Sequence, residues 1–216
     1  MARTNTTKNT NGSSANGSNT SNITKKNGNS MNGKTQSKNS NSSSEKSGKT
    51  LDDLFETELK DMYSAEKQLL EALPEMAKAA YNEDLQDAFE KHLDETHRQV
   101  DRLEKIFERL NIDKNDEETC EAMQGLIEEA HQIMDEFDRS SVRDSALIIA
   151  AQKVEHYEIA SYGSLVELAD VLGYSKITEI LERTLNEEKD TDEDLSEIAR
   201  DVNDEAYEMA QEAEYA

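Results

Sequence analysis

The feature of this chain that most constrains its fold is a helical repeat of apolar residues interrupted by carboxylates. It is clearest over residues 148–172, where one helix face recurs at alternating steps of three and four residues: Ile148, Ala151, Glu155, Glu158, Tyr162, Leu165, Ala169 and Leu172. A stripe of this kind normally faces a protein core. Because an unpaired buried carboxylate costs several kcal/mol, the two glutamates in the middle of the stripe require a partner.

Polar side chains interrupt similar stripes in three further segments, over residues 51–73, 85–106 and 181–199. Residues four apart lie on the same helix face, so these side chains can converge near one level of an antiparallel bundle. Carboxylates with few histidines suit hard or borderline cations such as iron and manganese. The pattern therefore predicts an iron or manganese (di-metal) centre, whose candidate ligands are Glu66, Glu95, Glu155, Glu158, Glu188, His92 and Asp192.

The alternative is that these acids are ordinary solvated residues. Asp and Glu account for 47 of the 166 residues after position 50, so some fall on any helix face by chance. Matching places on four helices, with apolar neighbours one turn away, favour the polar core site. His92 stays open, because a single histidine on a helix is as easily a hydrogen-bonded structural residue. No role is assigned to the remaining histidines. The nearby tyrosines are either hydrogen-bond partners of the site or core aromatics, and we expect the second: Tyr63, Tyr157 and Tyr162.

The first 50 residues differ in composition from the rest of the chain. They are mostly Asn, Ser, Thr, Gly and Lys, which cannot bury enough apolar surface to offset chain entropy, so residues 1–50 are predicted to be a disordered tail. The tail carries eight basic residues and one acid, and the remainder carries 16 basic and 47 acidic residues. The acidic part is not expected to bind nucleic acid, since phosphate contacts need Lys and Arg. The tail is either a solubilising leader or a contact for RNA, an anionic membrane or the acidic part.

The chain shows no sign of export or membrane insertion. No run of apolar residues approaches the roughly 18–20 that cross a bilayer, and the N-terminus has no apolar signal-peptide core. The single cysteine, Cys120, excludes an internal disulfide and suits a reducing cytoplasm. We expect Cys120 to be a small buried residue on a helix rather than a catalytic thiol.

The chain after residue 50 is predicted to be almost wholly helical, because no window alternates with the period of two that a strand needs. Thr50 is the expected N-cap of the first helix, Pro74 ends or kinks it, and Gly173 is an expected C-cap. The expected helices span about residues 50–72, 74–81, 84–110, 116–137, 141–172, 175–199 and 204–214.

Two long helices, a connection of roughly 30 residues and two more long helices describe an all-α antiparallel four-helix bundle. Its one long crossover contains an extra short helix. The bundle is predicted to form one domain over residues 51–200, followed by a C-terminal helical extension over residues 201–216 that is loosely packed or frayed.

Four segments of the chain resemble one protein family. They are Leu59–Leu69 (LKDMYSAEKQL), His92–Thr96 (HLDET), Gln152–Ala160 (QKVEHYEIA) and Leu185–Lys189 (LNEEK). In this order they closely resemble the YciE/YciF-like branch of the ferritin-like superfamily, over about residues 51–200. The resemblance implies a rubrerythrin-like bundle, a dimer and a bacterial stress-response protein without a settled biochemical activity. It also implies the inward ligand positions of that superfamily, which here are Glu66, Glu95, Glu158 and Glu188.

One departure from the family pattern concerns nitrogen ligands. Di-iron members of the superfamily carry Glu-x-x-His on two helices. Here Arg98 stands three residues after Glu95, and Thr191 stands three residues after Glu188, so neither position holds a histidine. Ferroxidase activity is therefore not carried over from the resemblance.

Three functional hypotheses follow from these patterns. The leading one is a cytoplasmic, dimeric stress protein with a carboxylate-rich core site that binds metal. The second is a non-enzymatic structural protein whose core acids pair with Arg98, with Lys67 or with one another through a shared proton. The third is a redox enzyme of the rubrerythrin or manganese-catalase type, which the missing histidines disfavour.

Overall fold

The structure, a computed structural model, describes residues 49–116 and 118–214, with side chains up to residue 211. Five α-helices occupy most of these residues: α1 (Leu51–Ala79), α2 (Glu83–Leu110), α3 (Glu121–Glu136), α4 (Ser141–Val171) and α5 (Ser175–Glu214). No strand occurs within the described ranges. The all-α prediction is confirmed, while the predicted disordered tail lies outside the described residues except for its last two.

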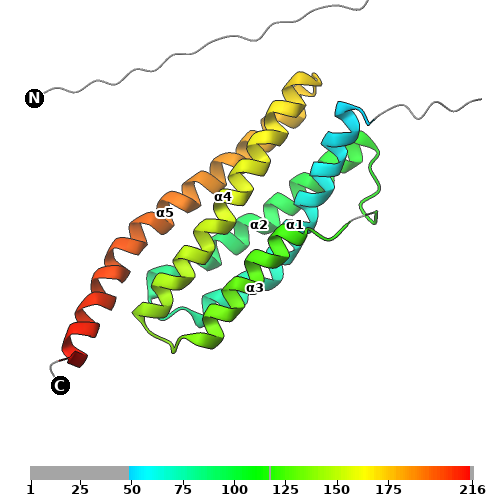
Figure 1. Ribbon diagram of the computed structural model, residues 1–216. Helices are drawn as coiled ribbons and strands as arrows, with labels where there is room; N and C mark the ends of the chain where they lie inside the picture. Colours follow the sequence, from blue (N-terminus) through cyan, green and yellow to red (C-terminus); the bar gives the residue numbers. More distant parts are fainter. Residues whose placement is uncertain (1–48, 117, 215–216) are drawn as a thin grey trace, which may run out of the picture. The chain divides into compact units, whose positions relative to one another are not determined.

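The helices pair into two hairpins (Figure 1). Helices α1 and α2 form one hairpin, α4 and α5 form the other, and α3 lies in the connection between them. The hairpins pack together through contacts of α1 with α4 and of α2 with α5, while α3 packs against α1 and α4. This is the predicted antiparallel four-helix bundle with one long crossover that carries an extra helix.

Helix α1 begins at a capping box and continues through its proline. The Thr50 side chain accepts a hydrogen bond from Asp53 N, and Asp53 Oδ2 accepts one from Thr50 N at 2.7 Å. Pro74 was expected either to end or to kink the first helix. It lies inside α1, so the first alternative, with a separate helix over residues 74–81, is wrong. Proline removes one backbone hydrogen bond, and buried Met76 holds the following turn on the core.

The ends of α2 and α4 follow their sequence signals. Helix α2 starts after Asn82, whose side chain caps its first turn, and ends at Asn111 in the left-handed conformation. Beyond α4 the chain passes through Gly173 at φ 78°, and Tyr174 N donates to Ala169 O at 2.9 Å. A residue without Cβ adopts this conformation without steric cost, so the predicted stop at the glycine is confirmed.

Two other predicted boundaries are wrong. Helix α3 starts at Glu121, later than the expected start near residue 116. Helix α5 runs without a break from Ser175 to Glu214, although an end near residue 199 and a separate piece from 204 were expected. Val202 lies in this expected gap and is fully buried, so core packing holds the segment in the helix.

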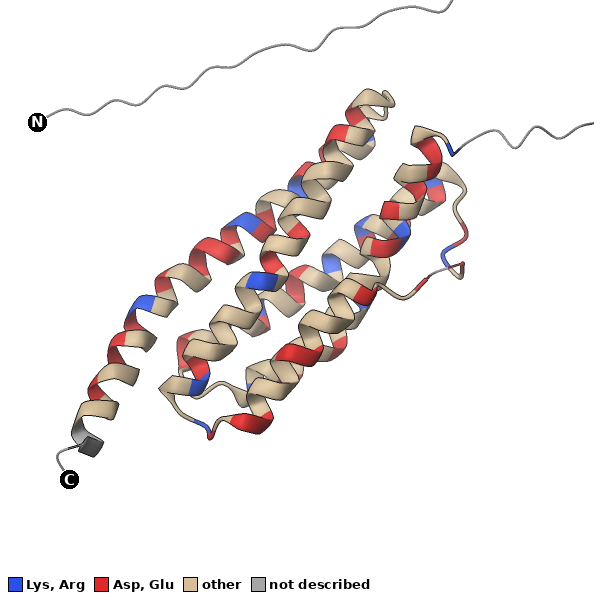
Figure 2. Ribbon diagram, in the orientation of Figure 1, with Lys and Arg blue, Asp and Glu red and all other residues tan. Residues whose placement is uncertain are grey.

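The interior of the bundle is mostly apolar. Buried aliphatic and aromatic side chains from all five helices line it, whereas Asp and Glu positions are spread along the helices (Figure 2). Among the described residues, no helix is both long enough and apolar enough to span a bilayer. The interior also holds buried carboxylates and one histidine.

Candidate metal centre

Four polar side chains from three helices meet inside the bundle. Helix α2 contributes His92, α4 contributes Glu155 and Glu158, and α5 contributes Glu188. One ligand atom of each lies within 4.8 Å of the others. All four residues are between 0 and 2% exposed. We call these four residues the His–Glu cluster, and all of them are among the ligands that the sequence predicts.

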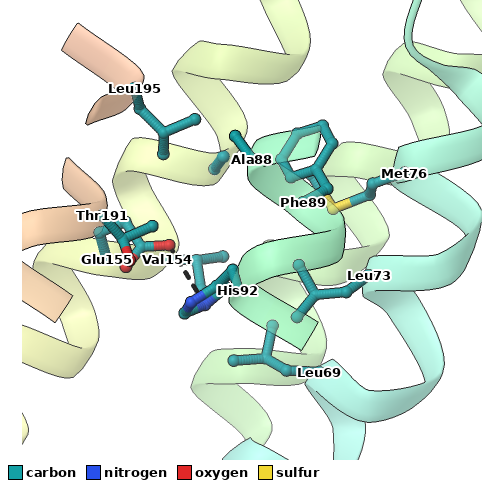
Figure 3. Close-up of a pocket in the computed structure, with 11 residues that line it drawn as sticks. Leu69, Leu73, Met76, Ala88, Phe89, His92, Val154, Glu155, Thr191 and Leu195 are labelled. Atoms are coloured by element: carbon teal, nitrogen blue, oxygen red, sulfur yellow. Dashed lines mark ion pairs between the residues drawn. The ribbon is translucent and has the colours of Figure 1, made fainter. Parts of the chain in front are cut away.

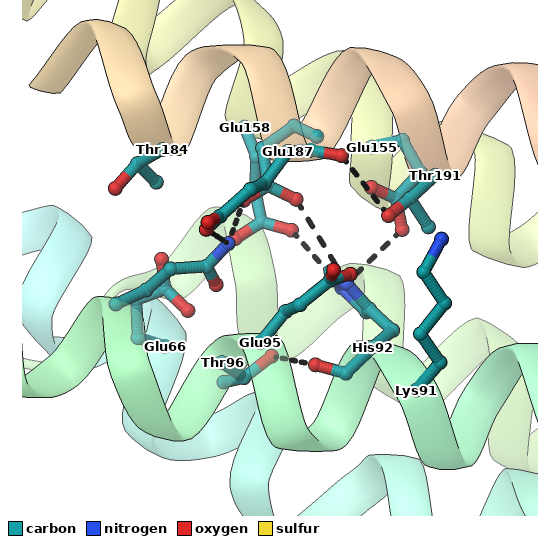
Figure 4. A network of polar contacts seen from close by, with 12 residues as sticks. Glu66, Lys91, His92, Glu95, Thr96, Glu155, Glu158, Thr184, Glu187 and Thr191 are labelled. Carbon is teal, nitrogen blue, oxygen red and sulfur yellow. Dashed lines mark hydrogen bonds and ion pairs between the residues drawn. The ribbon is translucent and has the colours of Figure 1, made fainter.

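His92 lies among the carboxylates of the cluster. Its Nε2 atom is 3.4 Å from Glu155 Oε1, a pair drawn in Figure 3, and 3.9 Å from Glu158 Oε2. Its Nδ1 atom is 4.0 Å from Glu188 Oε2, and Figure 4 shows the surrounding polar groups. Each ring nitrogen therefore faces a carboxylate, and a neutral imidazole nitrogen can bind a cation together with carboxylate oxygens.

Several buried atoms of the cluster have no hydrogen-bond partner among the described residues. They are both ring nitrogens of His92, both carboxylate oxygens of Glu158, and one oxygen each of Glu155 and Glu188. Buried polar atoms in folded proteins have a partner in about 90% or more of cases. The cluster therefore fits a cation, which can bind several oxygen and nitrogen atoms at once.

Burial controls the protonation of the cluster. Burial raises the pKa of Glu155, Glu158 and Glu188 well above the ordinary glutamate value, and the charges of neighbouring carboxylates raise it further. Burial also lowers the pKa of His92 to about 4. The imidazole is therefore neutral near neutral pH and offers a lone pair, while a cation that binds the glutamates displaces their protons.

Glu66 of α1 borders the cluster. It is 0% exposed, its Oε1 accepts a hydrogen bond from the Tyr162 hydroxyl, and its Oε2 has no partner among the described residues. Burial raises the pKa of Glu66 to about 8, against the opposing effects of the Tyr162 hydrogen bond and the Arg102 charge. The Glu66 charge in turn raises the pKa of Glu158. Glu66 thus adds a group from the fourth helix of the bundle to the same electrostatic site.

The two remaining predicted ligands lie nearer the surface. The Glu95 side chain is 13% exposed, with Oε1 3.6 Å from Arg98 Nη2 and with a buried, unpartnered Oε2 among the described residues. The Asp192 side chain is 25% exposed and faces Gln152 Nε2 at 3.3 Å and His156 Nε2 at 3.4 Å. Neither belongs to the group within 4.8 Å. Glu95 keeps one oxygen available for a ligand, whereas both Asp192 oxygens face other partners.

A second polar network holds Glu188. Gln99 Nε2 donates to Glu188 Oε1 and lies 3.5 Å from Glu187 Oε2. Arg102 donates to Glu187 through both terminal nitrogens, with 2.7 Å between Nη2 and Oε1, and to Thr184 Oγ1 at 3.1 Å. Glu187 therefore balances the Arg102 charge beside the cluster.

Arg102 and Glu187 were not among the predicted site residues. Arg102 lies three residues after Gln99 on the same face of α2, so helix periodicity could have indicated that it faces the site. Glu187 lies off the α5 face that carries the cluster glutamate. Its role follows from packing across the α2–α5 contact, for which the sequence has no local signal.

Cys120 is buried, as predicted, and lies in a polar triangle. Its Sγ is 3.1 Å from Asp61 Oδ2 and 3.0 Å from the Tyr157 hydroxyl, which donates to Asp61 Oδ2 at 2.5 Å. The residue is the N-cap of α3 rather than part of a helix. Burial raises the pKa of the Cys120 thiol, which favours the unreactive protonated form.

Comparison with known proteins identifies relatives of the whole bundle. A family described as a domain of unknown function, DUF892, matches residues 50–208. Protein YciF of Escherichia coli (strain K12) is 50% identical over 163 residues, which cover 75% of this chain and 98% of that protein.

Solved structures show the same bundle. The crystal structure of the E. coli stress protein YciF matches with a TM-score of 0.70 and 49% identity, over 72% of this chain and 98% of that one. YcfI of Rhodopseudomonas palustris, for which a structural role has been suggested, matches with a TM-score of 0.66 and 40% identity, over 70% and 96%. A Xanthomonas campestris protein at 23% identity and a TM-score of 0.60 shares the fold, over 75% and 99%. The chain therefore belongs to the DUF892 family, in its YciF-like branch, and has the ferritin-like helical bundle that its sequence predicts.

Proposed function

We propose that this chain is a stress-response protein that binds iron or manganese in the core of its helical bundle. Its relative in E. coli is described as a stress protein. The observation that carries the metal proposal is the His–Glu cluster, whose ligand atoms lie within 4.8 Å of one another and include buried atoms without hydrogen-bond partners among the described residues.

The charge of the site favours more than one cation. The three carboxylates of the cluster bring three negative charges when ionised, and Glu66 and Glu95 bring two more. A single divalent cation would leave excess negative charge in a buried place, where charge is costly. We therefore propose a di-metal centre, in which the cluster residues hold one cation and Glu66 and Glu95 extend the ligand set to a second. Bound iron or manganese would supply Lewis-acid or one-electron chemistry.

Titration of chelator-treated protein tests the proposal. Calorimetry and elemental analysis follow binding of Mn(II), and of Fe(II) without oxygen. We expect stoichiometric binding with thermal stabilisation, and loss of both in the Glu155→Gln/Glu188→Gln double variant. The exposed pair Glu167→Gln/Glu193→Gln on the same two helices is the matched control. Wild-type protein that binds neither cation, or a double variant that binds like wild type, contradicts the proposal.

A non-enzymatic structural protein is the second candidate. The raised pKa of the cluster glutamates favours it, because protons can neutralise these groups in place of a cation. Arg98 pairs with Glu95, and exposed Lys67 has its Nζ 5.4 Å from the centroid of the Tyr63 ring. In this candidate, protons shared among the cluster glutamates neutralise the site. Protein that is purified without metal and is not stabilised by added Mn(II) supports this candidate.

We also propose that the chain forms a homodimer in the cytoplasm. Val142 and Ile149 lie seven residues apart on one face of α4 and are 45% and 57% exposed, as expected of a surface that packs against a second chain. The free thiol of Cys120 suits a reducing compartment. Light scattering on purified protein measures the assembly, and a monomer at micromolar concentration contradicts the dimer.

A further inference from the structure

The two hairpins of the bundle meet along two seams, and a further helix covers one of them. Helix α3 packs against α1 and α4, so it covers the seam between those two helices. The seam between α2 and α5 has no such cover in the described part of the chain. The His–Glu cluster takes its ligands from α2, α4 and α5. A cation that passes between α2 and α5 therefore reaches these ligands without crossing another helix.

Two pairs of oppositely charged Arg or Lys and acidic side chains bridge the α2–α5 seam within the described ranges, and they differ in exposure. The side chains of Arg102 and Glu187 are 10% and 17% exposed. Lys91 Nζ lies 2.6 Å from Asp194 Oδ2, with the two side chains 51% and 48% exposed. Lys91 and Arg102 are eleven residues apart on α2, or about 16 Å along the helix. Because exposed ion pairs contribute little to stability, the Lys91–Asp194 pair can open while the bundle stays folded.

Between these two bridges, carboxylates lead from the surface to the core. Asp194 is half exposed, and the Glu95 side chain is 13% exposed with a buried, unpartnered Oε2 among the described residues. Figure 4 shows Lys91 and Glu95 extending from α2 towards α5. Behind them, His92 and Glu158 are nine-tenths or more buried and have unpartnered ligand atoms. A cation without water in a protein interior is costly, so a path to this place needs oxygen atoms along its length.

We propose that divalent cations enter the core through the α2–α5 seam and that the Lys91–Asp194 ion pair is the gate. This inference rests on the proposed function, because the His–Glu cluster is the destination of the cation. Lys91 occupies the Asp194 oxygen that an entering cation would meet first. Burial raises the pKa of Glu95, and the charge of Lys91, one turn earlier on α2, opposes that rise. The same charge repels a cation at Glu95, so the ion pair must break and Lys91 must swing outwards before the cation passes.

The exchange rates of Mn(II) test the gate on the full chain. Metal-free protein is mixed with Mn(II), loaded protein is mixed with excess EDTA, and the EPR signal of free Mn(II) follows each reaction. Lys91→Met removes the charge and keeps an apolar stem. We expect binding and release both to become faster by roughly tenfold, at the low end of the effect of charge on association rates. A gate changes the barrier for both directions, so an unchanged release rate overturns the proposal.

Two control variants separate the gate from a general effect of charge. Lys153→Met makes the same change in net charge and breaks an ion pair with Glu129 whose side chains are 44% and 46% exposed, between α4 and α3. We expect its exchange rates to equal those of wild type. Lys91→Asp/Asp194→Lys leaves the net charge unchanged and restores an ion pair across the seam, so its rates should return towards wild type. Equal acceleration in Lys153→Met and Lys91→Met, or a swapped protein as fast as Lys91→Met, overturns the proposal.

A variant at the covered seam tests the other route. Cys120 N donates to Ser64 Oγ at 3.0 Å, which ties the start of α3 to α1. Ser64→Ala loosens this contact and is expected to leave both rates unchanged. Faster exchange in Ser64→Ala and not in Lys91→Met places the route under α3 and overturns the proposal. Wild-type protein that binds no Mn(II) at equilibrium contradicts the proposed function and the gate with it, whereas tight binding with equal rates in wild type and Lys91→Met overturns the gate alone.

Discussion

The Nε2 atom of His92 lies 3.4 Å from Oε1 of Glu155, with both side chains 3% exposed. This contact is not an ion pair near neutral pH, because burial lowers the pKa of His92 to about 4. The two side chains come from α2 and α4, so the packing of the hairpins brings a nitrogen and an oxygen ligand together. His92 stands three residues before Glu95, on the opposite side from position 98, where the Glu-x-x-His pattern would put its histidine.

Glu158→Gln is expected to have opposite effects on metal-free and metal-loaded protein. Both Glu158 oxygens are buried without partners among the described residues. Burial costs an ionisable carboxyl more free energy than a neutral amide, so the variant raises the free energy of unfolding of the metal-free protein, by about 1 kcal/mol near pH 8. Metal affinity falls by at least about a hundredfold, since even groups that only support a ligand are worth about 10–100-fold. Urea unfolding and Mn(II) titration measure the two effects.

Glu167→Gln is the matched control for that prediction, because Glu167 is an exposed glutamate of the same helix. It is expected to change neither the free energy of unfolding nor the free energy of Mn(II) binding by more than about 0.5 kcal/mol, as for most surface substitutions. A Glu158→Gln protein that binds Mn(II) with wild-type affinity removes Glu158 from the ligand set.

The metal-free protein is expected to lose stability as the pH rises from about 6.5 to about 9. The pKa of Glu66 is raised to about 8 in the folded protein, so its stabilising contribution is present below the ordinary glutamate pKa and is lost as the pH rises through about 8. The effect of pH on the contribution of His92 is opposite. Its pKa is lowered to about 4 in the folded protein, so the protein loses stability as the pH falls below the ordinary histidine pKa. Urea unfolding at both pH values measures the change.

Glu66→Gln separates this effect from general alkaline destabilisation. The variant has no titratable group at position 66, so its free energy of unfolding is expected to fall less steeply between the two pH values. An equal fall in wild type and variant means that Glu66 does not hold its proton in the folded state.

The fold was largely predictable because each helix carries its own signals. The cap at Thr50 and the stop at Gly173 act through neighbouring backbone groups, and the structure shows both. The predicted helix boundaries were wrong at Pro74 and near Val202. An interruption of the helix was expected at each place, but packing against the core keeps both residues inside a continuous helix. A single sequence does not show how strongly such a residue is held against the core.

The site was predictable to the level of a helix face and no further. Spacing by three and four places Glu188 and Asp192 on one face of α5, yet Glu188 is fully buried and Asp192 turns to Gln152 and His156. Helix periodicity does not specify how close two helices lie at each turn. That distance, which depends on packing across the bundle, decides which acids converge.

Arg102→Met is expected to destabilise the protein by about 2 kcal/mol, because it leaves Glu187 without the guanidinium that balances its charge. Arg98→Met is the control: Arg98 is 48% exposed and pairs with Glu95 at 3.6 Å, so a loss of about 0.5 kcal/mol or less is expected. Thermal and urea unfolding measure the loss of stability in each of the two variants. Equal losses contradict the assignment of Arg102 to a buried pair.

The thiol of Cys120 is expected to react with a thiol reagent only when the protein opens. Cys120 is fully buried, and burial raises its pKa, so the folded state offers neither access nor thiolate. The labelling rate in native buffer should match the opening rate and rise with added urea. Immediate labelling of the native protein contradicts the burial of this residue.

Tyr162→Phe is expected to cost about 1–3 kcal/mol, because the buried Glu66 then loses the hydroxyl that donates to its Oε1. The matched control is Tyr174→Phe. The Tyr174 hydroxyl donates to Asp52 Oδ1 at 2.8 Å, and this hydrogen bond is exposed to solvent. It should cost less, since water replaces that partner.

A double-mutant cycle shows whether the Tyr162 effect acts through Glu66. In a Glu66→Met background the Tyr162 hydroxyl has already lost its acceptor, so Tyr162→Phe should be neutral or stabilising there. Urea unfolding of the four proteins is expected to yield a coupling energy of about 0.5–3 kcal/mol. A cycle in which the two changes simply add would mean that Tyr162 stabilises the core by packing alone. Glu66 would then be held in the site by its burial, without a hydrogen bond from α4.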